Sequence, residues 1–96
     1  MSPDSMLLAP AGAIVANGQV TIGVSTVRLP DHPSRAILVV PHPDNTGDIF
    51  IGHVGVQINT GVYLPSTGLS LGLHNVADIY AISTIADQTI TYLAVK

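Results

Sequence analysis

The chain has 96 residues, a net charge of −3 and no cysteine, and only 9% of its residues are charged while 47% are hydrophobic. An ordinary soluble domain carries roughly 25% charged residues, so a lone copy of this chain is expected to be poorly solvated. The length allows one domain with one core. The lack of cysteine excludes disulfides, thiolate nucleophiles and cysteine-based zinc sites.

Arg28, Arg35 and Lys96 are the only cations, too few for the basic stripe that binds phosphate backbones, so nucleic acid is not an expected partner. Val, Ile and Thr are abundant, and these residues favour strands. All six acids are aspartates, and Glu and Lys, which usually coat exposed helices, are nearly missing. No apolar run approaches the ~18 residues of a membrane span. The composition predicts an all-β protein without a membrane partner.

Residues 1–13 are rich in Ala and Pro and are expected to form a flexible arm, followed by one β-sandwich domain over 14–96. The apolar stretch in this arm resembles a secretory leader. However, it follows Asp4 and no Lys or Arg precedes it, which argues against a leader.

Asn17-Gly18 separates two apolar runs, and this dipeptide is typical of a two-residue hairpin turn. The pattern therefore predicts a first hairpin with strands over 12–16 and 19–24. A run of five apolar residues at 36–40 predicts a central strand buried on both faces. Further short strands are expected at 48–54, 56–58, 62–64, 69–73, 78–83 and 88–95.

Turn signals about ten residues apart predict a single antiparallel β-sandwich, or a jelly-roll-like barrel, of seven to eight short strands. Apolar residues alternate onto both faces of several strands, as at 79–82. A two-layer sandwich buries only one face of each sheet. We therefore expect a neighbouring subunit to cover some of the outer faces.

Gly68–Gly72 matches the Gly-x-Ser-x-Gly pattern of a hydrolase nucleophile elbow, which needs a strand, a strained turn and then a helix. No helical periodicity follows, and the chain is too short for that fold. Ser70 is therefore interpreted as the polar position between two buried leucines.

Four histidines, His32, His42, His53 and His74, could in principle bind a metal or sense pH. None is close enough to another to present two ligands from one element, which favours plain surface-loop positions. A small β-barrel enzyme that uses these histidines with a metal stays a distant alternative.

The stretch Asp44–Asp48 has the oxygen donors and the glycine of a calcium loop but lacks the distal bidentate Glu. A plain turn explains it, and calcium or a glycan remains an alternative ligand. Asp78 and Asp87 flank a strand and are interpreted as turn or cap residues, not as paired catalytic carboxylates. The few aromatic residues cannot form a stacking platform: Phe50, Tyr63, Tyr80 and Tyr92. The sequence thus assigns no catalytic, cofactor-binding or metal-binding residue, and predicts a protein that is not an enzyme.

From Asp44 onward the chain combines turns with short strands at 44–52, 61–65, 69–71, 78–83 and 88–93. In these segments it resembles small virion proteins of tailed bacteriophages. Those proteins pair a strand that ends in Val-Gly or Ile-Gly with a later Leu-x-Pro-Gly-x-Ser turn. The turn in this chain, 64–70, has two more residues between Pro and Gly.

This resemblance implies a β-sandwich component of a capsid or tail, and in particular a decoration (cement) protein on the outer capsid lattice. It implies partners in the major capsid protein and in copies of the chain itself, often as a trimer, and a location on the virion surface after synthesis in the host cytoplasm. The alternative is a tail or fibre module that binds a host-surface receptor or glycan. No catalytic residue comes with the resemblance.

Overall fold

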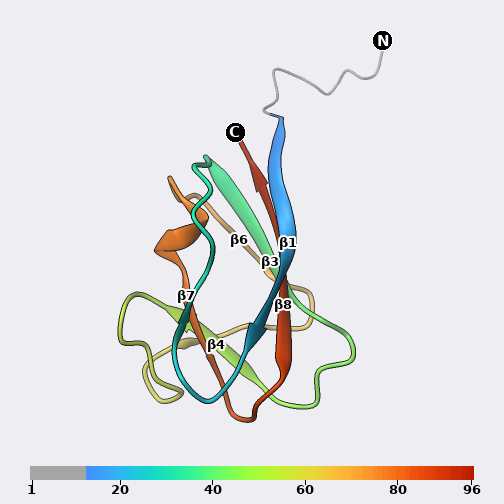
Figure 1. Cartoon of the computed structure of the whole chain (residues 1–96), viewed down its shortest axis with the longest axis vertical. Coiled ribbons are helices and arrows are strands. Elements are labelled where there is room, and N and C mark those ends of the chain that lie inside the picture. Colours follow the sequence, from blue (N-terminus) through green and yellow to red (C-terminus); the bar gives the residue numbers. More distant parts are fainter. Residues whose placement is uncertain (1–12) are drawn as a thin grey trace.

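A computed structural model of the chain describes residues 13–96. They form an all-β sandwich of two four-stranded antiparallel sheets (Figure 1). The predicted sandwich is confirmed, and the sheets do not close into a barrel. Except for Ala13, the predicted arm lies outside the described residues.

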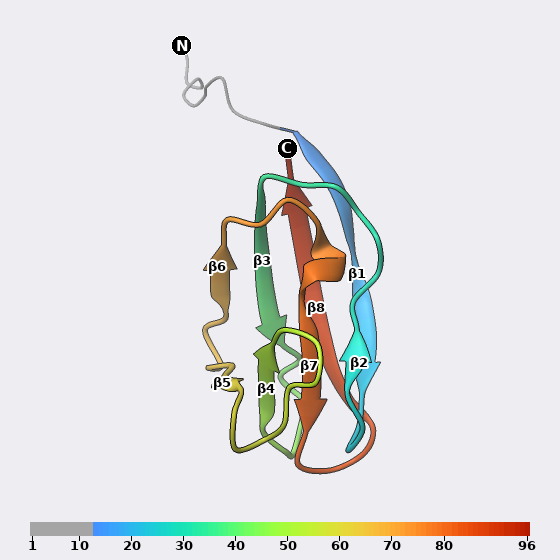
Figure 2. The ribbon, with the colours of Figure 1, turned by 90° about the vertical axis from the view of Figure 1, so that its left-hand side faces the viewer.

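The sheet that we call sheet A has the strand order β1-β8-β3-β6 and consists of β1 (Ile14–Ile22), β8 (Gln88–Val95), β3 (Ala36–Pro41) and β6 (Leu69–Leu71). Sheet B has the order β2-β7-β4-β5 and consists of β2 (Val27–Arg28), β7 (Tyr80–Ser83), β4 (Ile49–Gly52) and β5 (Val62–Tyr63). A 3-10 turn, η2 (Val76–Asp78), leads into β7. Figure 2 shows sheet B in front of sheet A.

The core lies between the two sheets and follows from the two-residue period of the strands. In β8 every second residue is buried, beginning with Gln88 and including Ile90 and Tyr92, while the residues between them are half-buried. The same alternation buries Ile49 and Ile51 of β4. The largest fully buried side chains of the core are Ile22, Leu29, Ile37, Val39, Ile49, Leu64, Val76 and Ile90.

The prediction of a hairpin at Asn17-Gly18 was wrong. β1 runs straight through the dipeptide and pairs with β8 along its whole length, from Ile14 to Ile22. The ring of Tyr92 lies over Gly18, so that a Cβ there would be only 3.1 Å from the Tyr92 hydroxyl oxygen. Long-range pairing with β8 thus overrides the local turn preference, and the glycine allows a close approach of the ring.

Three further strand predictions differ from the structure. Residues 56–58 belong to the loop between β4 and β5, and β2 was not predicted at all. Strand β3 is an inner strand, as predicted, but only its core face is fully buried, because Leu38 on its other face is 38% exposed. The number of strands, eight, agrees with the expected count.

The outer face of sheet B is covered in part by the chain itself. The β4–β5 loop, residues 53–61, folds over β7 (Figure 2). Val56 in this loop is buried, and its carbonyl oxygen accepts a hydrogen bond of 2.8 Å from Thr26 Oγ1. A Cβ added to Gly52 or Gly61 would lie 2.8 Å from a methyl group of Val56. No neighbouring subunit is therefore needed to cover this part of the sheet.

Candidate interaction surfaces

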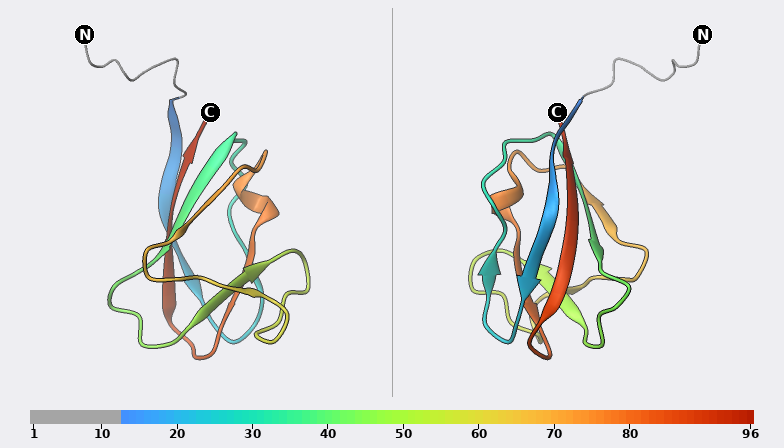
Figure 3. Two further views of the ribbon diagram at one scale, coloured as in Figure 1. Left: turned by 180° about the vertical axis from the view of Figure 1, so that it is seen from behind. Right: turned by 45° about the vertical axis from the view of Figure 1, so that its right-hand side comes forward.

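Within residues 13–96, no other element covers the outer face of sheet A. Alternation along the four strands turns uncharged side chains outward, and we call the following eleven the charge-free face: Asn17, Gln19, Thr21, Ala36, Leu38, Val40, Ser70, Thr89, Thr91, Leu93 and Val95. No charged residue occurs in any strand of sheet A. The face is turned toward the viewer at the right of Figure 3, where β1 and β8 lie in front.

The charge-free face is apolar at one end and threonine-rich at the other. The register places Leu38 of β3 between Leu93 of β8 and Ser70 of β6. Toward the other end of the sheet, Thr21 lies opposite Thr89. Isolated exposed hydrophobic residues are normal, but an apolar patch within a face that lacks any charge is typical of a protein contact surface.

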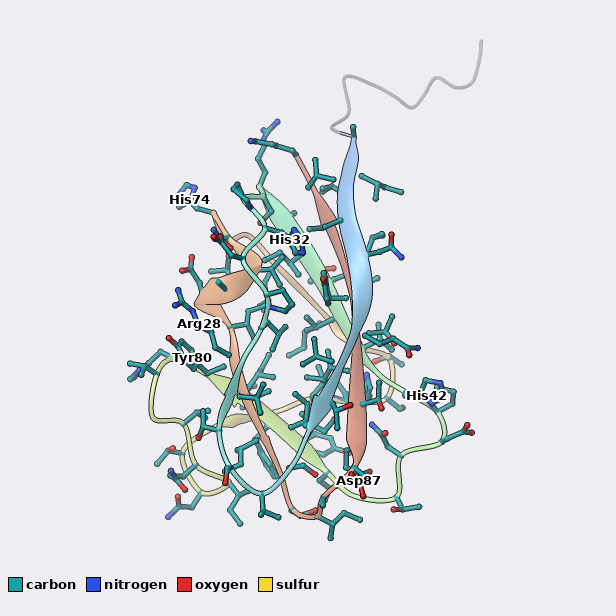
Figure 4. The ribbon with its side chains drawn as sticks, viewed as in Figure 1. Arg28, His32, His42, His74, Tyr80 and Asp87 are labelled. Carbon is teal, nitrogen blue, oxygen red and sulfur yellow. The ribbon has the colours of Figure 1, made fainter. Side chains whose placement is uncertain are left out.

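The charges of the described residues lie in loops and at strand ends. In the described part of the chain, Arg28 of β2 is the only charged residue that lies in a strand, and neighbouring residues hold its side chain in place. Its Nε donates a 2.8 Å hydrogen bond to the Ala77 carbonyl oxygen, and its guanidinium lies 5.7 Å from the centre of the Tyr80 ring (Figure 4). Through these contacts Arg28 has a structural role on the outer side of sheet B.

An open cleft of about 370 Å³ lies between the β3–β4 loop and the segment that follows β5. The loop is held rigidly by polar contacts. The buried Gln88 accepts hydrogen bonds of 2.8 Å from the backbone N–H groups of Thr46 and Gly47. The Asn45 amide donates to the Thr89 carbonyl oxygen and accepts from the Thr89 N–H, both at 2.8 Å.

The cleft brings together an exposed aromatic ring and polar groups. Tyr63 is 52% exposed and packs edge-on against Phe50, with 5.8 Å between the ring centres. His42 and Asp48 line the same cleft. Such a combination of an aromatic surface and a few polar groups can bind a small polar ligand. No local sequence pattern indicates this combination, because the pairing of β4 with β5 is what brings Tyr63 close to the loop.

The expected calcium loop, Asp44–Asp48, forms one wall of this cleft. Both amide atoms of Asn45 are already bonded to Thr89, and the Asp48 N–H is bonded to Thr84 Oγ1 at 3.1 Å. The Asp44 N–H donates to His42 Nδ1 at 3.1 Å. These hydrogen bonds hold the loop in its shape, so several of its polar groups already have partners within the chain.

The four histidines do not gather at one site, although His32 and His74 lie on neighbouring segments, where the Ser34 N–H donates to the His74 carbonyl oxygen at 2.7 Å. The His32 ring is 5.9 Å from the Tyr92 ring, His53 and His74 are exposed, and His42 lies at the cleft on another side of the molecule (Figure 4). Within residues 13–96, no three His, Cys, Asp or Glu side chains come together as a metal site.

The remaining candidate residues do not meet either. Ser70 is exposed in the antiparallel strand β6 and lies opposite Leu38, with a loop and not an α-helix directly after the strand. Asp78 lies in η2, before β7, whereas Asp87, with a φ of 62°, lies in the turn after β7. The two carboxylates are thus separated by the length of that strand.

A second, apolar groove of about 260 Å³ opens between β6 and sheet B, and Asp78 is the one charged residue on its wall. The other residues that line it are Ile51, Gly52, Val62, Leu69, Leu71, Leu73 and Ile79. This groove marks the side of the sandwich where two very short edge strands, β5 and β6, leave the gap between the sheets accessible.

No family model, curated protein or solved structure matches this chain. Within residues 13–96, there is also no helix that is long and apolar enough to span a membrane.

Proposed function

We propose that the protein is a structural component of a tailed-phage virion, namely a decoration (cement) protein that stabilises the head by bridging capsid subunits. Its partners are the major capsid protein and copies of itself. It is made in the host cytoplasm, resides on the capsid surface and has no catalytic role.

The charge-free face is the observation that carries this proposal. Desolvating a charged surface is costly unless every charge finds a partner. An uncharged sheet with an exposed apolar end instead gains about 25 cal/mol for each Å² of apolar surface buried. Permanent interfaces are large and apolar, and Leu38, Leu93 and Val95 provide the apolar part of such a contact.

The test is to add the purified protein to capsids that lack it, and to measure binding by co-sedimentation and added density by electron microscopy. We expect saturable binding and capsids that resist heat better. Leu38→Asp should weaken binding at least about tenfold, because it buries an unpaired charge in the contact. Ile85→Asp is the matched control: Ile85 is 43% exposed but lies in the β7–β8 turn, away from the charge-free face.

A wild-type protein that ignores capsids would refute the decoration role. The cleft beside Tyr63 then favours the second candidate, a tail or fibre module that binds a host-surface receptor or glycan. That module should bind host cells in the absence of capsids, and Tyr63→Ala should abolish this binding while Leu38→Asp leaves it unchanged.

A further inference from the structure

The outer edge of β1 is the one long unprotected strand edge in the described part of the chain. The other edge strands, β2, β5 and β6, have two, two and three residues, whereas β1 has nine. Proteins usually protect such edges with charges, prolines, bulges or short strands. β1 has no charge and no proline, and its only irregularity is a bulge near its start, between Ile14 and Ala16.

The hydrogen-bond pattern of sheet A shows which backbone groups of β1 face outward. In an antiparallel sheet, successive residues of an inner strand bond to opposite neighbours. The His42 N–H donates to the Thr89 carbonyl oxygen at 3.0 Å, in register with the β3–β8 ladder, so Thr89 and every second residue after it bond toward β3. The residues between them therefore bond toward β1, as does Lys96, whose N–H donates to the Ala13 carbonyl oxygen at 2.9 Å.

The register of β1 and β8 completes the assignment. Gly18 and Val20 lie opposite Tyr92 and Ile90, and these two belong to the alternate residues of β8 whose backbone groups bond to β1. Consequently, the N–H and C=O groups of the alternate residues in β1 point away from β8: Asn17, Gln19 and Thr21. Among residues 13–96, no further strand of sheet A lies on that side, as the right-hand view of Figure 3 shows.

We propose that a second copy of this chain binds here, with its own β1 antiparallel to the first about a two-fold axis. An axis beside Gly18 places Asn17 opposite Gln19 of the second copy, and an axis beside Gln19 places Asn17 opposite Thr21. In both registers, outward-facing backbone groups meet outward-facing groups of the other copy. The contact is therefore isologous and continues the sheet from one copy into the next.

The charge distribution favours a second copy over a different protein. Each chain carries a net charge of −3, yet β1 and the neighbouring charge-free face carry none, so two copies do not repel each other along this edge. A charged strand of a different protein would meet no residue of opposite charge on β1. Pairing of the two β1 strands also joins two charge-free faces into one surface. The pairing therefore adds to the proposed structural role, and its purpose rests on that role.

The first test uses edge prolines on opposite sides of sheet A. Gln19→Pro removes an outward N–H from β1 without removing a bond to β8. Ser70→Pro is the matched control. Ile37 and Val39 bond toward β6 and pair with Leu71 and Leu69, so the Ser70 N–H faces the opposite outer edge. We expect sedimentation at increasing concentration to show a wild-type dimer, at least about tenfold weaker association for Gln19→Pro, and an unchanged dimer for Ser70→Pro.

The second test needs no proline. The double variant Asn17→Lys/Gln19→Lys places like charges opposite each other or beside each other in the pairing, and should also give monomers. In wild-type protein, amide exchange at Asn17, Gln19 and Thr21 should be slow in the dimer and fast after dilution. These measurements need no capsid, so a dimer that ignores capsids refutes only the decoration role, and a monomer that binds capsids refutes only the pairing.

Three results would overturn the pairing. The first is a wild-type protein that stays monomeric at the highest accessible concentration. The second is a dimer that withstands both β1 variants but is lost in Thr89→Lys/Thr91→Lys, which points to contact through the charge-free face. The third is slow amide exchange of β1 that persists in the monomer and is lost on deletion of residues 2–12, which means that the chain's own N-terminal segment occupies the edge.

Discussion

Gln88 connects the turn before β8 to the loop that forms the cleft. It is buried, its Oε1 accepts from the backbone N–H groups of Thr46 and Gly47, and its Nε2 donates to the Ala86 carbonyl oxygen at 2.9 Å. One side chain thus satisfies three backbone groups that no strand pairing reaches. A buried polar residue is expected to be bonded in this way.

Replacing Gln88 should destabilise the protein more than the volume of this one side chain suggests. Gln88→Leu keeps the volume but leaves the Thr46 and Gly47 N–H groups without their acceptor, so we expect the free energy of unfolding to fall by about 1–3 kcal/mol. Urea denaturation measures the loss. Gln57→Leu, the same substitution at an exposed loop position, should change the free energy of unfolding by less than about 0.5 kcal/mol. Equal effects at the two positions would contradict the role given to Gln88.

At the scale of elements, the β4–β5 loop acts as a cover for sheet B. The apolar residues on the outer side of β7 and β4 suggested a missing subunit, but Ile82 is only 4% exposed in a single chain. Val56 packs where Gly52 and Gly61 have no side chains. The two glycines therefore allow the loop to lie flat on the sheet.

This cover predicts a contrast between two valines in the same loop. Val56→Ala removes two buried methyl groups and should lower the free energy of unfolding by about 1–3 kcal/mol. Val54→Ala is the matched control, because Val54 is 65% exposed, and it should have almost no effect. Denaturation of both variants side by side checks the prediction. If Val54→Ala lowered the free energy of unfolding as much as Val56→Ala, the loop would not pack as described.

At the scale of the whole molecule, charges contribute little to holding the fold together. Within residues 13–96, the one close approach of a basic side chain to a carboxylate is that of His42 Nδ1 to Asp44 Oδ2, at 3.8 Å, where Nδ1 accepts the Asp44 N–H and the Asp44 side chain is 91% exposed. Exposed pairs of this kind contribute little. Stability and association must therefore come from apolar packing and backbone pairing.

Salt should accordingly have little effect on stability and should not weaken association. Raising NaCl from about 0.05 to about 0.5 M shortens the screening length severalfold, yet the free energy of unfolding should change by less than about 0.5 kcal/mol. Sulfate should strengthen self-association and capsid binding, because it favours burial of surface. Sedimentation and denaturation across the salt series measure both effects. Dissociation by NaCl would instead point to contacts between charged groups.

The amino-acid sequence by itself determined the fold class, because β-branched composition, two-residue alternation and frequent turn signals are local properties. It correctly placed Ile49 and Ile51 on the opposite side of β4 from Phe50. Strand pairing is not local, and that is where the predictions went wrong. Asn17-Gly18 has the local chemistry of a turn, but pairing of β1 with β8 across some seventy residues keeps it extended. The same non-local packing decided that residues 53–61 cover one sheet, that Tyr63 meets the β3–β4 loop, and that the outer face of sheet A and the edge of β1 remain open.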